Sequence, residues 1–555
     1  MVPIKIITVE KSRELENKAN EGGLSFAEMM ENAGRSVAQA IRRRLGVKDR
    51  RIVVLVGPGN NGGDGLVAAH YLREMGAWAT CYIWKRDVEG DANFHRVEAS
   101  SLPVVWAEDD PQFEALQGLL SGVDVVVDAL LGVGASRPIS GTLGELLEQV
   151  KQGLVERRWP ARLAETVPGA RVKDSPLVVA VDCPTGLDCD TGALDPAALP
   201  ADVTVTFAYP KVGLLRFPGA EAVGEIVVAD IGIPAGLAGD VPLEMAAAQQ
   251  IRGWLPGRPA SAHKGTFGRA LIVAGSVNYV GAAALAGAGA KRVGTGLVTM
   301  ALPAPIQAAV AATLTEATYL LLPHDLGVIA AGAVEVLQEA MAGYDALLLG
   351  PGLTQEKETV TFVHAFLGLK RSERKGRMGF VSSSREAEAE RLTMPPLVVD
   401  ADGLNAMATA DEWWKALPPE TILTPHPGEM ARLMGRDTSA KEIQADREGM
   451  ALRMAAEWGV VLVLKGALTV VAAPNGRVMV LPFANPGLAT AGSGDVLAGA
   501  IVGLRAQGME AFEAAVAGAY LHGLAGQLAR ADLGDMGMVA GDLPPRLPLA
   551  LRCVR

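Results

Sequence analysis

The sequence contains little cysteine. Four cysteines stand among its 555 residues, at positions 81, 183, 189 and 553. So few cysteines form no disulfide framework, and we expect the protein in a reducing compartment. Cys183 and Cys189 are further apart than the roughly two-to-four-residue spacing of a zinc knuckle, which argues against a structural zinc site.

Long apolar runs and an excess of positive charge are also missing. No run of about 18 apolar residues exists, so the sequence predicts no membrane-spanning helix, and the first residues lack the apolar core of a signal peptide. The net charge is −11. Because nucleic acids and anionic membranes bind basic surfaces, neither is expected as a partner. We expect a cytoplasmic homo-oligomer that binds small molecules.

Apolar and small residues are abundant instead. Apolar residues make up 49% of the chain, charged residues 20%, and there are 64 glycines. At about 100–200 residues per domain, the length allows two to four domains. A stretch rich in Gly, Pro and Ala near residues 235–260 predicts the boundary. We therefore expect domains at 1–240 and 241–555, with a short helix over 243–252.

Short apolar runs alternate with helical segments in both halves. This alternation is typical of parallel sheets covered by helices on both faces. The predicted fold class is therefore α/β, with two three-layer domains. Two segments, 155–175 and 370–393, interrupt the alternation, and we interpret them as surface insertions whose role the sequence does not specify.

A glycine-rich stretch at residues 485–499 runs into an Ala-rich segment that we expect to be a helix. Gly492 and Gly494 let the backbone turn and approach a ligand closely. The first amides of the helix and its dipole then form a site suited to a phosphate. Asp495 would be repelled by that phosphate, so it is better suited to accept a proton from a hydroxyl group being phosphorylated. The alternative is an ordinary helix capped by Ser493 and Asp495.

A second glycine-rich stretch, residues 57–65, follows an expected strand at 51–56. Three of its glycines have the G-x-G-x-x-G spacing of a dinucleotide-binding loop, and a helix is expected over 66–75. The next strand ends in no acidic residue, so this spacing alone does not establish a dinucleotide site. Two asparagines and an aspartate in the stretch suggest side-chain ligands for polar groups or a hard cation.

Polar side chains also follow later strands of the first half. Asp128 ends one expected strand, and Asp182 another, with Thr185 just after it. In open α/β sheets ligands bind at the carboxyl ends of the strands. Together with Asn61, these oxygen ligands suit an alkali or alkaline-earth cation better than zinc. One such aspartate could be a helix cap, but three polar strand ends are less readily explained in that way.

Three motifs make a family resemblance specific. They are Asn-Asn-Gly-Gly-Asp at 60–64, the stretch 128–138, and Val-Asp-x-Pro-Thr-Gly at 181–186. They resemble the motifs of the NAD(P)H-hydrate epimerase family, the YjeF N-terminal domain. The resemblance implies a Rossmann-like fold, interconversion of the R and S epimers of hydrated NADH or NADPH, and a bound potassium ion.

The same resemblance implies residue roles. Asn61, Asp128 and Thr185 would contact K⁺. Inverting one ring carbon needs reversible loss of its hydroxyl or ring opening, and hence a proton donor and acceptor. We assign this catalytic role to Asp182, with Lys211 as a second candidate that could instead be a solvated lysine. The substrate contacts would be Asn60, Asn61, Gly62, Gly63, Asp64, Gly132, Val133, Gly134, Ala135, Ser136, Arg137, Pro138 and Asp182.

The second half repeats the placement of polar residues at strand ends. Asp400 and Asp402 follow one expected strand, His426 another and Lys465 a third. Helix capping alone does not explain such repetition. No His or Cys is spaced to share a metal with His426. We therefore interpret His426 as a hydrogen-bond donor to substrate, or else as a satisfied buried histidine.

Three motifs resemble the ribokinase-like superfamily: Gly-Ser-Gly-Asp at 492–495, Thr-Pro-His-Pro-Gly-Glu at 424–429 and Lys-Gly-x-x-Thr at 465–469. With His-Lys-Gly-x-x-Gly at 263–268 and Asn-Pro-Gly at 485–487, they resemble the ADP- or ATP-dependent NAD(P)H-hydrate dehydratase family, the YjeF C-terminal domain. The second domain would then be a ribokinase-like three-layer α/β sandwich. The two resemblances cover nearly the whole chain, in the order found in bifunctional NAD(P)H-hydrate repair enzymes.

The resemblance to the dehydratase family implies that Asp495 is the catalytic base. It would take the proton of the ring hydroxyl as that hydroxyl attacks the terminal phosphoryl group. Mg²⁺ is expected on the nucleotide. The resemblance implies ADP as the donor in bacteria and archaea and ATP in eukaryotes, and because the sequence shows no targeting segment we expect ADP. The nucleotide would contact Lys465, Gly466, Ala467, Leu468, Thr469 and Gly494. The hydrated nicotinamide nucleotide would contact Ala282, Gly352, His426 and Asp495.

Two other functions remain open from the sequence. A ribokinase-like kinase of a vitamin precursor, of the hydroxymethylpyrimidine or hydroxyethylthiazole type, shares the glycine loop and the aspartate. It would release a phosphorylated product and would leave the first half unexplained. Alternatively, the first domain is a nucleotide-binding scaffold without catalytic activity.

Overall fold

The chain divides into two compact units, Val2–Val241 and Pro242–Arg555. No helix in the part of the chain that is described has the length and apolar character needed to cross a bilayer. The computed structural model describes residues 3–134, 137–164, 176–369, 394–435 and 438–555, with the backbone alone for 156–164.

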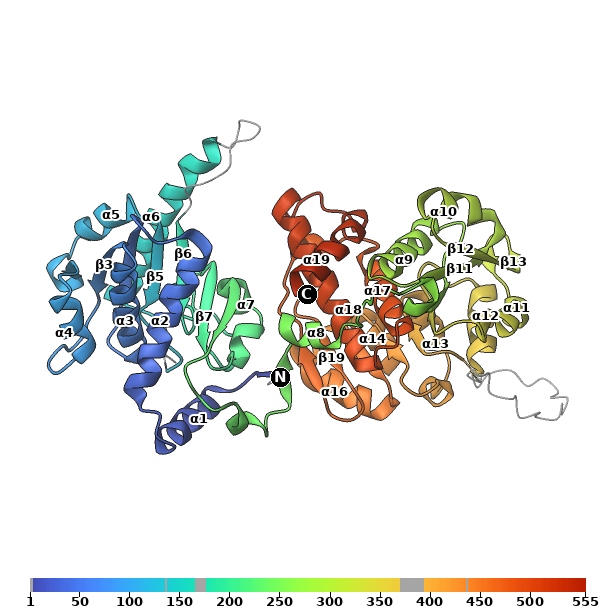
Figure 1. Cartoon of the computed structure of the whole chain (residues 1–555), viewed down its shortest axis with the longest axis horizontal. Helices are drawn as coiled ribbons and strands as arrows, with labels where there is room; N and C mark the ends of the chain where they lie inside the picture. Colours follow the sequence, from blue (N-terminus) through green and yellow to red (C-terminus); the bar gives the residue numbers. More distant parts are fainter. Residues whose placement is uncertain (1–2, 135–136, 165–175, 370–393, 436–437) are drawn as a thin grey trace. The chain divides into compact units, whose positions relative to one another are not determined.

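The first unit is built on a parallel sheet with strand order β4-β3-β2-β5-β6-β7-β8. Helices α2, α3 and α4 pack on one face, and α5 and α6 on the other (Figure 1). The strands are β2 (Arg51–Val56), β3 (Trp78–Ile83), β4 (Val104–Trp106), β5 (Val125–Ala129), β6 (Leu177–Val181), β7 (Val203–Phe207) and β8 (Glu225–Ala229). The main helices are α1 (Val9–Glu21), α2 (Phe26–Leu45), α3 (Asn60–Glu74), α4 (Ala92–Ala99), α5 (Glu114–Leu120) and α6 (Thr142–Ala164).

The strand order of the first unit changes direction between β2 and β5. Chain connections lead from β2 outward to β3 and β4 on one side, and from β5 outward to β8 on the other. At such a switch point the loops after the two central strands separate and leave a crevice. The segments beginning at Asn60 and Asp128 start from these two strands, so the sheet places both of them at the crevice.

The second unit contains a mixed sheet with strand order β9-β20-β19-β18-β17-β16-β15-β10-β11-β12. Strand β19 is antiparallel to its neighbours, and the remaining pairs in this order are parallel. The strands are β9 (Leu243–Met245), β10 (Arg269–Val273), β11 (Leu297–Pro303), β12 (Thr318–Leu322), β15 (Ala346–Leu349), β16 (Leu397–Val399), β17 (Ile422–Leu423), β18 (Val461–Leu464), β19 (Val470–Ala472) and β20 (Val478–Val480).

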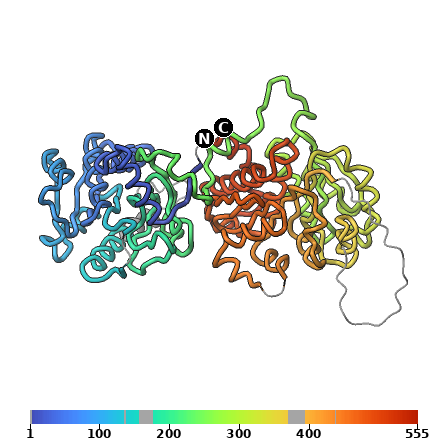
Figure 2. Tube along the Cα trace, turned by 90° about the horizontal axis from the view of Figure 1, so that it is seen from below, coloured from blue at the N-terminus to red at the C-terminus, as the bar shows by residue number. Residues whose placement is uncertain are grey.

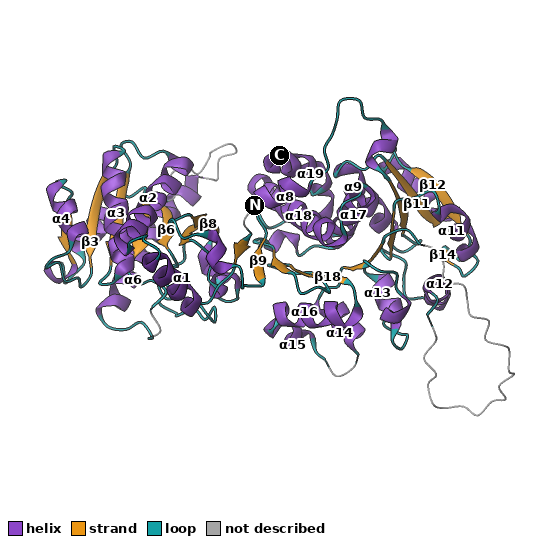
Figure 3. Cartoon of the chain, turned by 60° about the horizontal axis from the view of Figure 1, so that its bottom comes forward, coloured by secondary structure: helices purple, strands orange, loops and turns teal. Residues whose placement is uncertain are grey.

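Helices cover both faces of this second sheet, as Figure 3 shows. One face carries α8 (Ala248–Trp254), α9 (Val280–Arg292), α17 (Ser493–Ala506), α18 (Ala511–Leu533) and α19 (Leu547–Val554). The other carries α11 (Ala333–Met341), α12 (Lys357–Leu367), α13 (Asp402–Met407), α14 (Pro427–Met434), α15 (Ala440–Ala445) and α16 (Arg447–Trp458). The chain enters this unit beside its C-terminal helices, where α8 packs on α18 and α19 (Figure 2). The predicted α/β class with three layers is confirmed for both units.

Two of the helices expected from the sequence differ in the structure. The helix expected at 66–75 starts earlier, because α3 begins at Asn60. The glycines at the start of α3 do not form a loop but allow the helix to pack closely on β5: a Cβ added to Gly65 would lie 2.5 Å from Ala129 Cβ. The helix expected over 243–252 is strand β9 followed by α8.

The two expected insertions lie partly or wholly outside the described residues. Residues 155–164 are helical and continue α6, so the segment expected as an irregular insertion begins as regular structure. Residues 165–175 and 370–393 lie outside the described residues.

Close contact between α9 and α17 predicts that a substitution at Gly499 strongly destabilises the second unit. A Cβ added there would lie 2.0 Å from the carbonyl oxygen of Ala286, so the two helices would have to separate. We expect Gly499→Ala to lower the free energy of unfolding of the second unit by about 1–3 kcal/mol, measured by denaturant unfolding. Gly281→Ala on α9, where an added Cβ meets nothing within 4 Å, is the control. Equal stability of the two variants would contradict this packing.

Candidate functional site

In the second unit, the segment that follows the glycine-rich stretch is helix α17, which starts at Ser493. Gly492 before it has φ of 90°, a left-handed conformation that favours glycine. An added Cβ there would lie 2.6 Å from Cδ1 of Leu285 on α9. Asp495 therefore enters the first turn of α17 beside a sharply turned backbone.

Lys465 connects this turn with the strand ends. Its ammonium nitrogen lies 2.5 Å from Asp400 Oδ1 and 3.5 Å from Glu429 Oε2. It also faces Gly494, where an added Cβ would be 3.5 Å from Nζ. Thr424 Oγ1 donates to the same Asp400 oxygen at 2.7 Å. The ends of β16, β17 and β18 and the start of α17 thus meet at one place.

The surroundings of Asp495 favour its protonated form. Burial raises its pKa to about 7, and the charge of Asp400 adds to the rise while Lys465 opposes it. A carboxyl group with a pKa near neutrality can take up a proton in one step and release it in another. The arrangement therefore suits Asp495 to act as a general base on a hydroxyl group of a ligand that binds at the start of α17.

His426 is half-exposed and caps helix α14. Its Nδ1 accepts a hydrogen bond from the Gly428 backbone N–H at 3.0 Å, and its Nε2 lies 3.4 Å from Glu429 Oε1. Partial burial lowers its pKa, and nearby Lys465 adds to that effect. A neutral imidazole whose Nδ1 accepts carries its proton on Nε2, where it can be donated to a ligand. With 49% of its side chain exposed, His426 is not a satisfied buried histidine.

The other predicted residues of the second unit form two groups. Gly352 has φ of 66°, and a Cβ added to it would lie 2.8 Å from Ala282 Cβ, so these two residues are neighbours. Residues 465–469 form the turn between β18 and β19, closed by a 2.8 Å hydrogen bond from Thr469 Oγ1 to the Gly466 carbonyl.

In the first unit, a pocket of about 470 Å³ lies at the carboxyl edge of the sheet. Of the predicted residues, those lining it are Asn60, Asn61, Asp64, Gly132, Val133, Gly134 and Asp182. Helices α1 and α2 add lining residues that the sequence analysis missed, because an amphipathic helix gives no local signal of a ligand site: Arg13, Glu16, Phe26, Met29, Met30 and Ala33.

Asn61, Asp128 and Thr185 come together beside this pocket. Thr185 donates to Asp128 through its Oγ1 at 2.7 Å and its backbone N–H at 2.8 Å. The backbone of Leu131 accepts from Asn61 Nδ2 and donates to Thr185 Oγ1, both at 3.1 Å. Burial raises the pKa of Asp128 to about 6.

This oxygen-rich set contains a single carboxylate, which fits a monovalent cation and not a transition metal. Within the described ranges, no group of three or more His, Cys, Asp or Glu is placed to hold a metal ion.

Asp182 directly follows β6 and has φ of 62°, which is unusual for a residue other than glycine and is typical of functional positions. Its Oδ1 accepts from Lys211 Nζ at 2.5 Å, Thr206 Oγ1 at 3.0 Å and the Phe207 backbone N–H at 3.1 Å. Lys211 is 1% exposed, so it is not a solvated lysine. These contacts fix Asp182 in one orientation at the pocket.

Several predicted residues of the first unit do not line the pocket. Gly62 and Gly63 are closely packed: a Cβ added to Gly62 would lie 2.1 Å from the Gly57 carbonyl oxygen, and one added to Gly63 would lie 2.8 Å from Met30 Sδ. Arg137 and Pro138 are exposed outside the pocket, and Ala135 and Ser136 lie outside the described residues.

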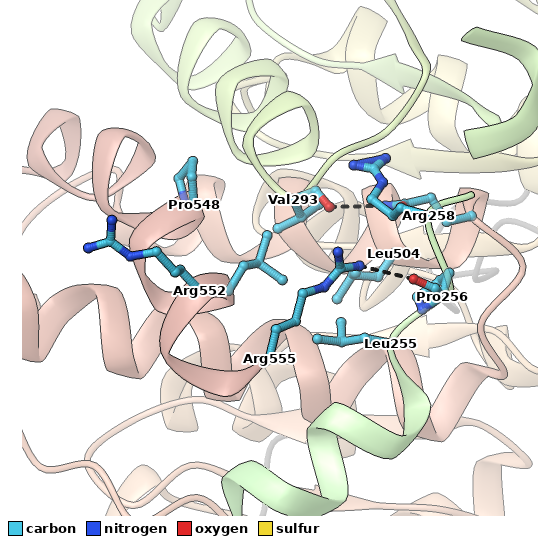
Figure 4. A pocket seen from close by; sticks show the side chains of 10 residues that line it. Leu255, Pro256, Arg258, Val293, Leu504, Pro548, Arg552 and Arg555 are labelled. Carbon is cyan, nitrogen blue, oxygen red and sulfur yellow. Dashed lines mark hydrogen bonds between the residues drawn. The ribbon is translucent and has the colours of Figure 1, made fainter. Parts of the chain in front are cut away.

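Another pocket of about 470 Å³ lies at the C-terminal ends of α9 and α17 (Figure 4). Three arginines, Arg258, Arg552 and Arg555, surround its largely apolar lining. Arg258 donates to the Gly294 carbonyl, and Arg555 to the Pro256 carbonyl at 3.0 Å. None of the predicted site residues lines this pocket, and two of its arginines tie chain segments together, so it is not part of the candidate site.

Sequence comparisons match both units to known families. The profile of the NAD(P)H-hydrate dehydratase family matches residues 270–548. The profile of the YjeF-related protein N-terminus matches residues 26–213. The chain is also similar to a crystal structure of the ADP/ATP-dependent NAD(P)H-hydrate dehydratase of Bacillus subtilis, co-crystallized with ATP and Mg²⁺. That similarity has 30% identity and a TM-score of 0.45, and it covers 56% of this chain and 98% of that one.

Two full-length relatives extend these matches across both units. The chain is 39% identical to the bifunctional NAD(P)H-hydrate repair enzyme Nnr of Moorella thermoacetica, over 94% of this chain and 92% of that protein. It is 37% identical to the protein of the same name from Thermofilum pendens, over 100% of this chain and 97% of that protein. The chain therefore belongs to the family of bifunctional NAD(P)H-hydrate repair enzymes.

Proposed function

We propose that the first unit interconverts the R and S epimers of hydrated NADH and NADPH, and that the second unit dehydrates the S epimer with ADP or ATP. The observation that carries the second activity is the position of Asp495. It lies in the first turn of α17, close to the partly buried Lys465–Asp400 ion pair, and burial raises its pKa to about 7. A base that accepts the proton of a hydroxyl group, placed beside a helix N-terminus that binds phosphate, is suited to phosphorylation of that hydroxyl group.

In this proposal the ring hydroxyl attacks the terminal phosphoryl group while Asp495 takes its proton. The first amides of α17 stabilise the charge that develops on the phosphoryl oxygens. Phosphate then leaves with the C–O electron pair, and loss of a proton from the neighbouring carbon restores the dihydropyridine ring. His426 and the neighbours Ala282 and Gly352 would contact the hydrated nucleotide.

We propose the nucleotide site at residues 465–469 and Gly494. Lys465 is adjacent to Gly494, and the turn that follows Lys465 is exposed at Gly466 and Ala467. An exposed turn beside a helix N-terminus leaves room for a chain of phosphates. Mg²⁺ would accompany the nucleotide and neutralise its charge. We also propose ADP as the preferred donor, and a cytoplasmic homo-oligomer as the form of the protein.

For the first unit, we propose Asp182 as a catalytic residue of epimerisation, with the pocket residues Asn60, Asn61, Asp64, Gly132, Val133 and Gly134 contacting substrate. Asn61, Asp128 and Thr185 would hold K⁺. The buried oxygen set fits such an ion, which would supply a fixed positive charge that organises the loops after β2, β5 and β6.

Potassium should therefore affect one reaction and not the other. We expect replacement of K⁺ by tetramethylammonium, which is too large for the site, to slow epimer exchange by about 10-fold or more, because the loops lose their organising charge. Asp128→Asn should abolish that response. Epimer exchange is followed by chromatography of hydrated NADH, and dehydration of the purified S epimer in the same buffers is the control. Equal epimerisation in both buffers would contradict a potassium site.

A direct test of the proposed dehydration uses purified S epimer with Mg²⁺ and either ADP or ATP. The expected result is return of the reduced-nicotinamide absorbance together with one inorganic phosphate for each NADH formed. A vitamin-precursor kinase would instead transfer phosphate to hydroxymethylpyrimidine or hydroxyethylthiazole and leave the absorbance unchanged. That outcome would reject the proposal for the second unit.

A further inference from the structure

Three carboxyl groups face one another across the pocket of the first unit. Asp182 comes from the end of β6, Asp64 from the second turn of α3, and Glu16 from α1. Glu16 lies before residue 26, where the match to the family profile begins. The buried ammonium group of Lys211 is already paired with Asp182. Three carboxylates in so confined a space repel one another, so the pocket favours retention of a proton.

The hydrogen bonds distinguish two of these carboxyl groups. All three donors to Asp182 meet its Oδ1, which leaves Oδ2 as the atom able to accept a proton. Within the described residues, no hydrogen bond is donated to the Asp64 carboxyl group, although Asp64 is 8% exposed. A buried carboxyl group without donors is more stable when protonated. Asp182 is thus arranged as an acceptor and Asp64 as a donor.

The charges that face Asp64 have the same effect. They are the carboxyl groups of Asp182 and Glu16 and, with opposite sign, Lys211 and Arg86. Burial raises the pKa of Asp64 well above its usual value, and Asp182 and Glu16 add to the rise. Arg86 is itself engaged, since it donates to Asp91 at 2.7 Å. Neither cation therefore removes the preference of Asp64 for its neutral form.

We propose that Asp64 is the proton donor and Asp182 the proton acceptor of the epimerisation. This assignment rests on the proposed function of the first unit and adds the identity of the acid. Hydration of an enamine places the hydroxyl on the carbon attached to nitrogen. When that C–O bond breaks, its electron pair stays on oxygen, which takes the proton of Asp64 and leaves as water.

The ring nitrogen supplies the electron pair that stabilises the resulting cation as a C=N bond. Water then adds to the other face of this carbon and gives its proton to Asp182, so the carbon is inverted and no net proton is consumed. Transfer of the proton from Asp182 back to Asp64 restores the starting state. The step needs water alone as co-reactant and no oxidant or reductant.

The test is Asp64→Asn in the full-length chain, with epimer exchange measured by chromatography at constant K⁺. The amide keeps the shape and polarity of the side chain but has no acidic proton. We expect exchange to fall by about 10²- to 10⁴-fold. Dehydration of the purified S epimer by the second unit should be unchanged, and the thermal transition of the first unit shows whether the variant is folded. Asp109→Asn, at an exposed position of the same unit, is the matched control.

The pH profile provides a second readout that a merely structural residue would not change. In the wild-type chain, exchange should fall as pH rises through the pKa of Asp64, because the donor loses its proton. Asp64→Glu should recover part of the rate and keep this alkaline decline, whereas the residual activity of Asp64→Asn should lack it. Exchange by folded Asp64→Asn within about threefold of wild type would overturn the assignment. A wild-type chain without any exchange would overturn the proposed function itself.

Discussion

Asp495→Asn is expected to lower the rate of dehydration of the S epimer by about 10²- to 10⁴-fold, because the amide cannot accept the proton of the attacking hydroxyl. Nucleotide binding should persist, since the carboxylate repels phosphates and the amides of α17 remain in place. Dehydration is measured by the reduced-nicotinamide absorbance, and nucleotide binding by calorimetry. Epimer exchange in the first unit of the same molecules should stay at the wild-type rate.

The direction in which the dehydration rate changes with pH also tests Asp495 as the base. Burial and Asp400 raise the pKa of Asp495 to about 7. A base must be ionised to act, so the rate of dehydration should rise with pH up to about 7 and level off above it. Asp411→Asn, at an exposed position of the same unit, should keep both the rate and the profile. Near-normal dehydration by Asp495→Asn, or a rate that falls with rising pH, would remove Asp495 as the base.

Lys211→Met is expected to destabilise the first unit by about 3–5 kcal/mol and to abolish epimer exchange. The ammonium group is 1% exposed and lies 2.5 Å from Asp182, so its removal leaves a buried carboxylate without its counter-charge. Burial is the largest single effect and disfavours the charged lysine, but the charge and the hydrogen bond of Asp182, with smaller contributions from Cys189 and Cys183, together raise the pKa of Lys211. Because this pKa is raised, the contribution of Lys211 to stability is present at neutral pH and is lost as pH rises through the pKa. Denaturant unfolding and epimer exchange are the two measurements.

A second substitution separates the effect of the unpaired charge from other effects of Lys211→Met. Asp182→Asn combined with Lys211→Met removes both charges and should be more stable than Lys211→Met alone, while remaining inactive. Lys18→Met is the matched control, because Lys18 forms an exposed ion pair with Glu14 at 2.6 Å and should cost no more than about 1 kcal/mol. If Lys211→Met unfolded at the same denaturant concentration as wild type, the buried Lys211–Asp182 pair would not contribute to the stability of the first unit.

Much of the site could be predicted because buried parallel strands are nearly continuous apolar runs. The first polar residue after each run marks the carboxyl edge of the sheet, which locates Asp128, Asp182 and Lys465. The start of α17 could be predicted because glycine at position 492 signals a turn just before an Ala-rich helix. Asp400 also follows a strand, but only the structure shows its carboxylate paired with Lys465.

The remaining features depend on packing between distant segments. The low helix propensity of glycine predicts a loop at residues 57–65. Contact of α3 with β5 overrides it, since Gly65 lies against Ala129. Glu16 reaches the pocket from a helix that precedes the sheet, and Lys211 pairs with Asp182 after an intervening strand. No local sequence pattern indicates that Glu16 reaches the pocket or that Lys211 pairs with Asp182, so both contacts could be found only from the structure.

Recovery of reduced NADH from a mixture of epimers shows whether one chain carries both reactions. A mixture of R and S hydrated NADH is incubated with the full-length protein, Mg²⁺, K⁺ and ADP or ATP while the reduced-nicotinamide absorbance is recorded. We expect complete recovery of the absorbance in the wild-type chain, and fast partial recovery followed by a slow tail in Asp182→Asn. Partial recovery by the wild-type chain would show that the first unit does not epimerise the substrate. No recovery with either nucleotide would contradict the account as a whole.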